Sequence, residues 1–406
     1  MRILFSEALP MTRNIYLFSI LSAASLFLLS SCAGSENSEL PESVANLENL
    51  TVFPSDPEPQ FSIELTRKQR FGDMGDMIIG RISGVQVDQS GRVFIADDSN
   101  KQIIVFDADG HLIELLGREG RGPGEFEYIH NLVLDDNYIY AKDFGLHRVN
   151  FFSTETLQYV NTIPLQVEGE PQDELAGYSP SVFWLSTHSD LLVRFSQPFG
   201  RAGSDSGDEE RYDLFYKITQ EGNVKPEQVL REKADFVLVD RTANSVSVFG
   251  TPFGAKFKLD TTQDGIVVNR SDQFLFRYYD HNGTYQRAVY YPFSRKHLSR
   301  ETALQYYNNE NYRRAARSSD LPENWPVVQR FMSDDDDRLW ISTIIDDEDL
   351  YEWWLLDNSG ELLARHLLPR EQRIETVRNG HVYMRIENEA GAEEIVKFEL
   401  DFVEIE

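Results

Sequence analysis

The sequence predicts an all-β fold built by repetition of one four-stranded unit. Two features of composition favour strands and turns: 12% of the residues are aromatic, and the chain contains 25 glycines. A third observation concerns order along the chain. From Phe61 onward, short apolar stretches alternate with turns rich in Asp, Asn and Gly, and one unit recurs at intervals of about 50 residues.

The first copy of the unit contains apolar stretches at 82–87, 93–97, 103–106 and 112–116. Tight turns connect these stretches, such as Asp88-Gln89-Ser90-Gly91 and Asp107-Ala108-Asp109-Gly110. A second copy covers 131–163, and weaker copies cover 182–230, 249–293, 327–368 and 374–406. One four-stranded sheet cannot bury both of its faces, so the copies must stack around an axis. We therefore predict a six-bladed β-propeller over residues 59–406.

The ring of blades needs a closing strand, because a last blade of three strands would expose an unpaired edge. The segment Phe61-Ser62-Ile63-Glu64-Leu65 precedes the first copy and alternates apolar and polar residues. We predict that this segment joins the sheet of the last blade as its outer strand.

One stretch interrupts the repeat between the fourth and fifth blades. Ser299 is suited to cap a helix, Glu301 lies in the expected first turn, and Pro322 and Pro326 close the segment. We predict a short helical insertion at about 295–325.

The only cysteine, Cys32, follows Leu29-Ser30-Ser31 at the end of an apolar run that begins near Ile15. With Arg13 ahead of that run, the arrangement resembles the signal and lipobox of a bacterial lipoprotein. We expect residues 1–31 to be a signal peptide and Cys32 to be lipidated, which would anchor the chain to a membrane without spanning it. The alternatives are an ordinary cleaved signal and a buried free cysteine.

The segment 32–58 is polar and rich in proline, so we predict a flexible tether there. Translation can begin at Met1 or at Met11 without changing the mature protein. Position 33 is Ala rather than Asp, which, by resemblance to the sorting of known lipoproteins, favours the outer membrane over the inner membrane.

Composition excludes some classes of partner and site. The formal net charge is −28, which argues against nucleic acid because contacts to phosphates require a basic surface. With one cysteine, the chain can form neither an internal disulfide nor a thiolate metal site. The acidity suits solubility in an extracytoplasmic space.

A search for catalytic and metal-binding patterns finds none. The eight histidines form no paired zinc motif, and the serines near 204 and 206, in the acidic loop 200–210 of the third blade, lack a strand-to-helix elbow. The acidic runs 334–337 and 346–349 lack the spacing of a calcium loop, so we expect solvated turns. We assign no catalytic residue and no metal ligand, and the sequence identifies no cofactor.

The mouth of the central channel is the better candidate for a site. Loops that enter the innermost strands supply Arg81, Arg121, His130, Trp325 and Arg330. A basic and aromatic rim on an acidic protein would suit an anionic or sugar-like ligand. The alternative is that these side chains cover loop backbone or pair with nearby carboxylates.

A cluster of arginines in the inserted segment is a second candidate surface. Arg313, Arg314 and Arg317 could recognise an anionic partner, or they could hold the insertion against the acidic face of the propeller.

The motif residues resemble those of the NHL-type propellers, and specifically of bacterial lipoproteins known as 6-bladed beta-propeller proteins. The matching residues are Ile95-Ala96-Asp97-Asp98-Ser99-Asn100, then Gly117-Arg118-Glu119-Gly120-Arg121-Gly122-Pro123-Gly124-Glu125-Phe126, with a shorter echo at Asp143, Arg148, Val149 and Phe151. The resemblance implies the fold, but propellers of this kind include scaffolds, binding proteins and a few enzymes.

The function that we expect is non-catalytic binding of a ligand or an envelope protein outside the cytoplasm. The alternative is a metal-assisted hydrolase or lyase, similar to a lactonase, with its site in the central channel. Carboxylates or histidines that converge on the axis would favour the enzyme, and an apolar or arginine-lined channel would favour binding.

Overall fold

The computed structural model describes residues 40–72, 78–165, 174–186, 190–197, 211–241, 246–388 and 390–405. The chain divides into two units, Met1–Pro41 and Glu42–Glu406. All of the helices and strands in the described ranges belong to the second unit. The loop 200–210 that we predicted in the third blade lies outside the described residues.

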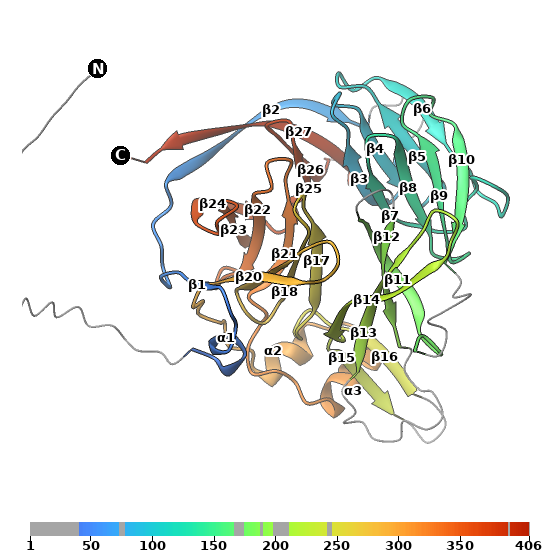
Figure 1. Ribbon diagram of the computed structural model, residues 1–406. Coiled ribbons are helices and arrows are strands. Elements are labelled where there is room, and N and C mark those ends of the chain that lie inside the picture. Colours follow the sequence, from blue (N-terminus) through green and yellow to red (C-terminus); the bar gives the residue numbers. More distant parts are fainter. Residues whose placement is uncertain are drawn as a thin grey trace, which may run out of the picture. The chain divides into compact units, whose positions relative to one another are not determined.

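The second unit contains six blades of four antiparallel strands (Figure 1). Blade 1 consists of β3 (Ile82–Val87), β4 (Val93–Asp97), β5 (Gln102–Phe106) and β6 (Leu112–Leu116). Blade 2 consists of β7 (Ile129–Leu134), β8 (Tyr138–Asp143), β9 (Arg148–Ser153) and β10 (Tyr159–Pro164). Blade 3 consists of β11 (Ser179–Leu185), β12 (Leu191–Ser196), β13 (Tyr212–Ile218) and β14 (Val224–Lys233).

The second half of the chain supplies the other three blades. Blade 4 consists of β17 (Phe257–Thr261), β18 (Ile266–Arg270), β19 (Leu275–Tyr279) and β20 (Tyr285–Tyr290). Blade 5 consists of β21 (Val328–Ser333), β22 (Leu339–Ile344), β23 (Leu350–Leu356) and β24 (Leu362–Pro369). Blade 6 consists of β25 (Arg373–Arg378), β26 (His381–Glu387), β27 (Glu393–Glu404) and β2 (Phe61–Phe71). The predicted six-bladed propeller is confirmed.

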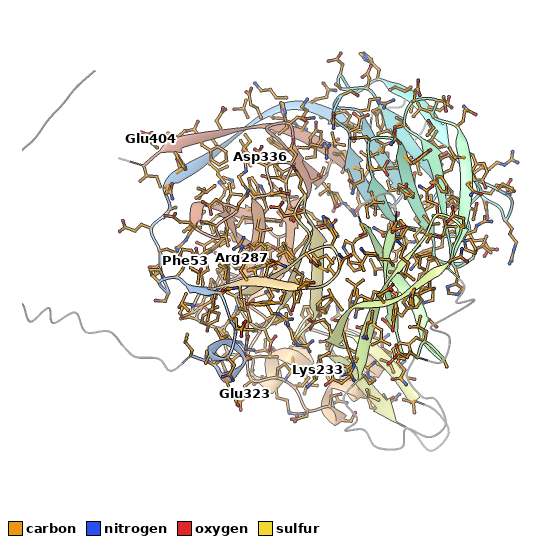
Figure 2. All side chains as sticks on the ribbon, viewed as in Figure 1. Phe53, Lys233, Arg287, Glu323, Asp336 and Glu404 are labelled. Atoms are coloured by element: carbon orange, nitrogen blue, oxygen red, sulfur yellow. The ribbon has the colours of Figure 1, made fainter. Side chains whose placement is uncertain are left out.

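The closing strand is β2, which pairs antiparallel with β27 from Phe61 opposite Glu404 to Phe71 opposite Ile395. The blue strand β2 runs beside the red strand β27 in Figure 1. Figure 2 labels Glu404, the last residue of β27. The prediction that an amino-terminal strand completes the last blade is confirmed. The strand is longer than expected, and its first two residues also pair with β24 of blade 5.

Six apolar clusters lie between neighbouring blades, one at each seam of the ring. The cluster between blades 1 and 2, for example, combines Phe94 and Ile103 with Leu132 and Ile139. The cluster between blades 6 and 1 contains Phe71 of β2, which is fully buried. Burial between sheets therefore continues around the whole ring, as stacking of amphipathic blades requires.

Residues 42–53 of the expected tether are docked on the propeller, which corrects the prediction of flexibility for that stretch, while residues 32–39 lie outside the described residues. Helix α1 (Glu42–Ala45) and strand β1 (Leu50–Val52) dock on blade 4, where β1 pairs parallel with β20. The reason is apolar burial: Val44 is fully buried, and Leu47 and Leu50 pack in the same cluster. We call residues 42–53 the strap. It ends with Phe53 stacked on Tyr291, with 4.8 Å between ring centroids.

The insertion between blades 4 and 5 contains two short helices, α2 (Arg300–Gln305) and α3 (Glu310–Ser318). The side chain of Ser299 accepts a hydrogen bond from the backbone of Thr302, which confirms the predicted cap. Asn309 caps α3 in the same way, and this second cap divides what the sequence suggested was one helix.

A hairpin of β15 (Val237–Arg241) and β16 (Val246–Gly250) lies beside α3. Leu238 of the hairpin and Ala315 of the helix share one apolar cluster. Blade 4 therefore begins at β17, later than the predicted start at 249, because the hairpin packs with the insertion.

Aspartates at the ends of second strands hold the loops that lead into the inner strands. Asp97 accepts hydrogen bonds from the backbone N–H groups of Gly80, Arg81 and Ser99. Asp143 does the same for Glu127 and Tyr128 in blade 2. These hydrogen bonds give the two aspartates a structural role.

We predict that deletion of residues 59–66 opens the ring and lowers the free energy of unfolding by several kcal/mol. A milder test is Ile63→Ala, which empties a buried position between blades 5 and 6 and should cost about 3 kcal/mol. Denaturant unfolding measures both. The exposed neighbour Glu64→Ala is the control and should change stability by less than about 0.5 kcal/mol. Unchanged stability in the deletion variant would contradict closure by β2.

Candidate functional site

A cavity of about 280 Å³ lies on the axis of the ring, because its lining comes from the inner strands of five blades. Blades 1 to 3 contribute neutral groups, such as Gln86, Asn131 and Ser181, together with His130. Blades 5 and 6 contribute Arg330, Arg373 and Glu375. We call this hollow the axial cavity.

A second hollow of about 450 Å³ adjoins the axial cavity at Arg330 and Arg373, which line both. Its described lining contains four cationic side chains and no carboxylate, and we call it the cationic pocket. The lining residues are Lys258, Gln329, Arg330, Ser342, Tyr351, Trp353, Arg370, Gln372 and Arg373. In a chain with a net charge of −28, this pocket is an exception to the surrounding acidity.

The cations of the pocket come from the beginnings of inner strands. Lys258, Arg330 and Arg373 lie within the first three residues of β17, β21 and β25, the inner strands of blades 4, 5 and 6. Arg370 lies in the crossing from blade 5 to blade 6, where its Nη2 donates to the carbonyl of Asp347 at 2.7 Å. Strand order in the ring therefore brings together charges that are far apart in sequence.

One buried carboxylate, Glu375, holds the arginines in place. Its Oε1 lies 3.2 Å from Nε of Arg373 and 2.8 Å from Nη2 of Arg385, and its Oε2 lies 3.6 Å from Nη2 of Arg330. The Nη1 of Arg330 also donates to the carbonyl of Ile374 at 2.8 Å. The Glu375 side chain is only 4% exposed, so its charge acts through a medium with little water.

Burial lowers the pKa of two cationic groups in the pocket. It lowers the pKa of Lys258 to about 8, and the charges of Lys256, Arg330 and Arg373 lower it as well, while Asp235 opposes them. Burial lowers the pKa of Arg330 to about 10, although the Glu375 carboxylate acts to raise it. At pH 7 both side chains are still charged.

The structure brings together only two of the five rim residues that the sequence suggested. His130 and Arg330 both line the axial cavity. The surroundings of the His130 ring lower its pKa by desolvation, and the nearby Lys142 charge lowers it further, so the ring is neutral at pH 7.

The other three rim residues have partners within the chain. Arg81 forms an ion pair with Asp98 and lies over the ring of Tyr128. Arg121 lies 2.9 Å from Glu127. The indole of Trp325 packs against Phe253 under the helical insertion, with 4.9 Å between ring centroids, and does not line either hollow. Placement of Trp325 at the rim was wrong, because the insertion offers it an apolar partner.

Sequence reasoning missed Lys258, Arg370 and Arg373 as pocket residues. The available signal was positional: Lys258 and Arg373 occupy the start of an inner strand, as His130 and Arg330 do. Alignment of the six blades on that position would have found them.

The three arginines of α3 are directed toward acidic groups of the same chain. Arg314 donates from Nε and Nη2 to one oxygen of the buried Asp240 in β15, at 2.8 and 2.6 Å. Arg317 lies 2.6 Å and Arg313 lies 3.9 Å from Glu310. Arg314 therefore holds α3 against the β15 hairpin, whereas Arg313 and Arg317 form ion pairs within α3 itself.

The opposite ends of inner strands β3, β7 and β21 are followed directly by Asp88, Asp135 and Asp334. Asp88 and Asp135 line a hollow of about 600 Å³ at that end. Their oxygens accept turn hydrogen bonds, for example from Arg92 and Tyr138. Aspartates therefore follow three inner strands at the end opposite the cationic pocket, where Arg92 and Arg378 also line the hollow.

The acidic run 334–337 includes a close group of three carboxylates, from Asp334, Asp335 and Asp336. We expected a solvated turn, but Asp334 is buried and accepts hydrogen bonds from Arg338 and from the indole of Trp340. Asp335 and Asp336 are exposed, and Asp335 accepts from the backbone of Asn379. These contacts give the run a structural role in closing its turn.

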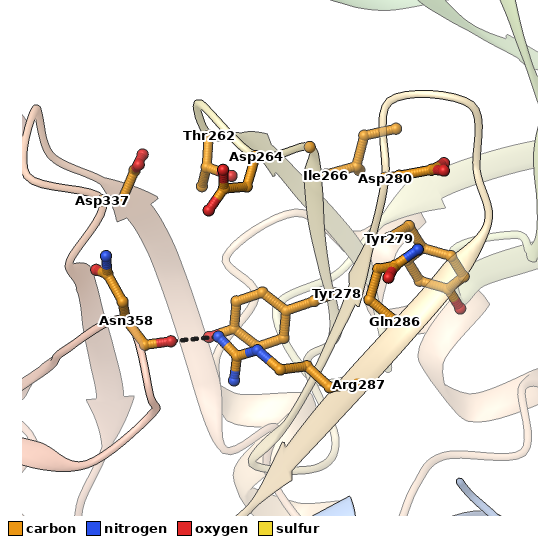
Figure 3. A pocket seen from close by; sticks show the side chains of 11 residues that line it. Thr262, Asp264, Ile266, Tyr278, Tyr279, Asp280, Gln286, Arg287, Asp337 and Asn358 are labelled. Atoms are coloured by element: carbon orange, nitrogen blue, oxygen red, sulfur yellow. Dashed lines mark hydrogen bonds between the residues drawn. The ribbon is translucent and has the colours of Figure 1, made fainter. Parts of the chain in front are cut away.

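Figure 3 shows a further hollow of about 500 Å³, between turns of blades 4 and 5. Arg287 lies over the ring of Tyr278, 3.6 Å from its centroid, and donates to the carbonyl of Asn358. Asp280 is engaged in its own turn, where it accepts from the backbone of Asn282 and Thr284. Arg287 thus serves the contact between blades 4 and 5, and Asp280 serves its own turn.

Comparisons with known proteins agree with this architecture. A family model described as 6-bladed beta-propeller matches residues 74–197. The chain is a β-propeller protein. A comparison of the propeller with the curated proteins found no match.

Two solved structures share the fold of the propeller at low identity. A Bacteroides fragilis protein described as exported is 12% identical, with a TM-score of 0.53, over 87% of this chain and 99% of its own. A member of the DUF4221 family from Bacteroides vulgatus is 12% identical, with a TM-score of 0.51, over 85% of this chain and 100% of its own. Identities at this level show the fold alone. In the described part of the propeller, no helix has the length and apolar character needed to cross a membrane.

We predict that Glu375→Gln destabilises the propeller by about 3 kcal/mol, because three arginines lose their shared carboxylate. Thermal and denaturant unfolding test this prediction. Glu387→Gln, at an exposed position in the same blade, should change stability by less than about 0.5 kcal/mol. Equal stability of the two variants would show that Glu375 does not balance the arginines.

Proposed function

We propose that this propeller is an exported, lipid-anchored binding protein that holds an anionic ligand in the cationic pocket and catalyses no reaction. The observation that supports it most directly is the lining of that pocket, in which Lys258, Arg330, Arg370 and Arg373 meet without a lining carboxylate among the described residues.

Like charges meet in the cationic pocket, in a partly dehydrated space. Cations held close together repel one another, and the repulsion grows as water is excluded. Glu375, which lines the axial cavity, balances part of this charge. Its carboxylate also pairs with Arg385, which lines neither hollow. An anion in the pocket would relieve the remaining repulsion and accept hydrogen bonds from several donors at once.

The arrangement favours binding over the alternative of a metal-assisted hydrolase or lyase. Such a site needs several carboxylates or histidines that converge on one point. The described lining of the two adjoining hollows offers Glu375 and His130, and Glu375 is engaged with arginines. An arginine-lined channel is the feature that we expected of a binding protein.

Export and lipid anchoring are supported by the sequence around Cys32. The apolar run, the small residues before Cys32 and the single cysteine each meet a separate requirement of lipidation. With Ala33 next to the cysteine, we propose the outer membrane as the destination.

Anion binding can be tested by calorimetry on the full chain in detergent, with inorganic sulfate as the probe. Lys258→Gln should weaken sulfate binding at least tenfold at pH 7, whereas Lys68→Gln, in an exposed ion pair on β2, should leave it unchanged. The parent protein should also lose affinity as the pH rises from 7 to 9, because Lys258 is charged below its pKa of about 8 and neutral above it. The Lys258→Gln variant should lack this pH step. Binding of sulfate that is equal in the parent and in Lys258→Gln would refute the site.

Anchoring can be tested with Cys32→Ser, which removes the only thiol that could be acylated. The parent protein should partition into the detergent phase and the variant into the aqueous phase. A variant that still partitions with detergent would contradict lipidation at Cys32.

A further inference from the structure

The two adjoining hollows offer a ligand different kinds of hydrogen-bonding group. The cationic pocket offers donors, namely its four cations and the amides of Gln329 and Gln372. It also contains Trp353, which is 3% exposed and whose indole N–H has no hydrogen-bond partner among the described residues. A buried donor without an acceptor is costly, and the pocket wall contains such an unsatisfied donor.

The blade 1 to 3 side of the axial cavity offers mainly acceptors. The hydroxyls of Ser83 and Ser181 donate to backbone carbonyls at 3.4 and 3.2 Å, and the side-chain amide of Gln86 donates to the carbonyl of Leu132 at 3.2 Å. The two hydroxyls then offer oxygen lone pairs, and Gln86 offers its amide oxygen together with its second N–H. The Oδ1 of Asn131 is buried and receives no hydrogen bond from the described residues.

A ligand that fits both hollows therefore needs oxygen acceptors at one end and donors at the other. Ammonium donors are disfavoured, because Arg330 and Arg373 also line the axial cavity. Hydroxyl groups are donors without charge, and they suit the acceptors of Asn131 and Gln86.

The volumes of the two hollows also favour an organic ligand. The cationic pocket measures about 450 Å³ and the axial cavity about 280 Å³, and together they lie in the range of sites for small organic molecules. An inorganic anion would fill only a small part of this space.

Resting on the anion-binding function proposed above, we propose that the ligand is a polyhydroxylated organic anion, of the class of sugar acids and sugar phosphates. Its charged group lies among Lys258, Arg370 and Arg373, and its hydroxylated part extends past Arg330 to Asn131.

Matched pairs of probes test the hydroxyl requirement by calorimetry on the full chain in detergent. Gluconate and hexanoate are six-carbon monocarboxylates that differ in their hydroxyls, and glucose 6-phosphate is compared with inorganic phosphate. At least one hydroxylated probe should bind ten times more tightly than its partner. The carboxylate pair and the phosphate pair distinguish a sugar acid from a sugar phosphate.

A variant of the axial cavity tests where the hydroxyls bind. Asn131→Leu keeps the side-chain size and removes the unpartnered acceptor, so it should weaken the preferred hydroxylated probe about tenfold and leave inorganic phosphate unchanged. Retained phosphate binding also shows that the variant is folded. Asn161→Leu, at an exposed position of β10 in the same blade, is the control and should change neither affinity.

The outcomes separate the two proposals. If gluconate and glucose 6-phosphate bind no better than hexanoate and phosphate while Lys258→Gln still weakens phosphate, the polyhydroxylated class is wrong and anion binding stands. If Asn131→Leu leaves every affinity unchanged, the hydroxylated part does not reach the axial cavity, and the inference is overturned. If none of the anions binds, both proposals fall.

Discussion

Pairing of β2 with β27 is the interaction on which the ring depends. The strand β2 completes the sheet of blade 6, and its side chains also enter two of the apolar seams, Ile63 between blades 5 and 6 and Phe71 between blades 6 and 1. Closure of these seams holds β25, the inner strand of blade 6, beside the inner strands of blades 4 and 5. The cationic pocket, which takes charges from all three strands, therefore relies on a strand from the other end of the chain.

Charge in the centre of the propeller follows from strand order. Cations begin three of the inner strands, and aspartates that close turns follow three of them. A chain with many carboxylates thus keeps a positive site at one end of its inner strands, provided that one buried acid, Glu375, moderates the repulsion there. The same acidity elsewhere would repel competing anionic surfaces while leaving small anions free to enter.

The sequence predicted those parts of the structure that depend on local chemistry. Asp88 and Asp107 indicate their turns, and Ser299 indicates a helix start, because these side chains accept hydrogen bonds from backbone groups two or three residues away. The strap was missed because burial of Val44 depends on blade 4, more than two hundred residues away. The cationic pocket was found only in part, since Lys258 and Arg373 meet only after the ring has closed. Trp325 was misplaced because its partner, Phe253, belongs to a segment whose packing the blade pattern does not describe.

The strap has a mechanical consequence. Tension applied to the chain ahead of Glu42 first reaches α1 and β1, and it passes into blade 4 through the parallel pairing of β1 with β20 and the stacking of Phe53 on Tyr291. Between the strap and β2, Arg365 of blade 5 binds the chain again, through Asp56 at 2.9 Å and the carbonyl of Pro57 at 2.8 Å. A pull from a surface to which the amino terminus is attached would therefore be borne by blades 4 and 5 as whole sheets. The closing strand would stay free of tension until those contacts had broken.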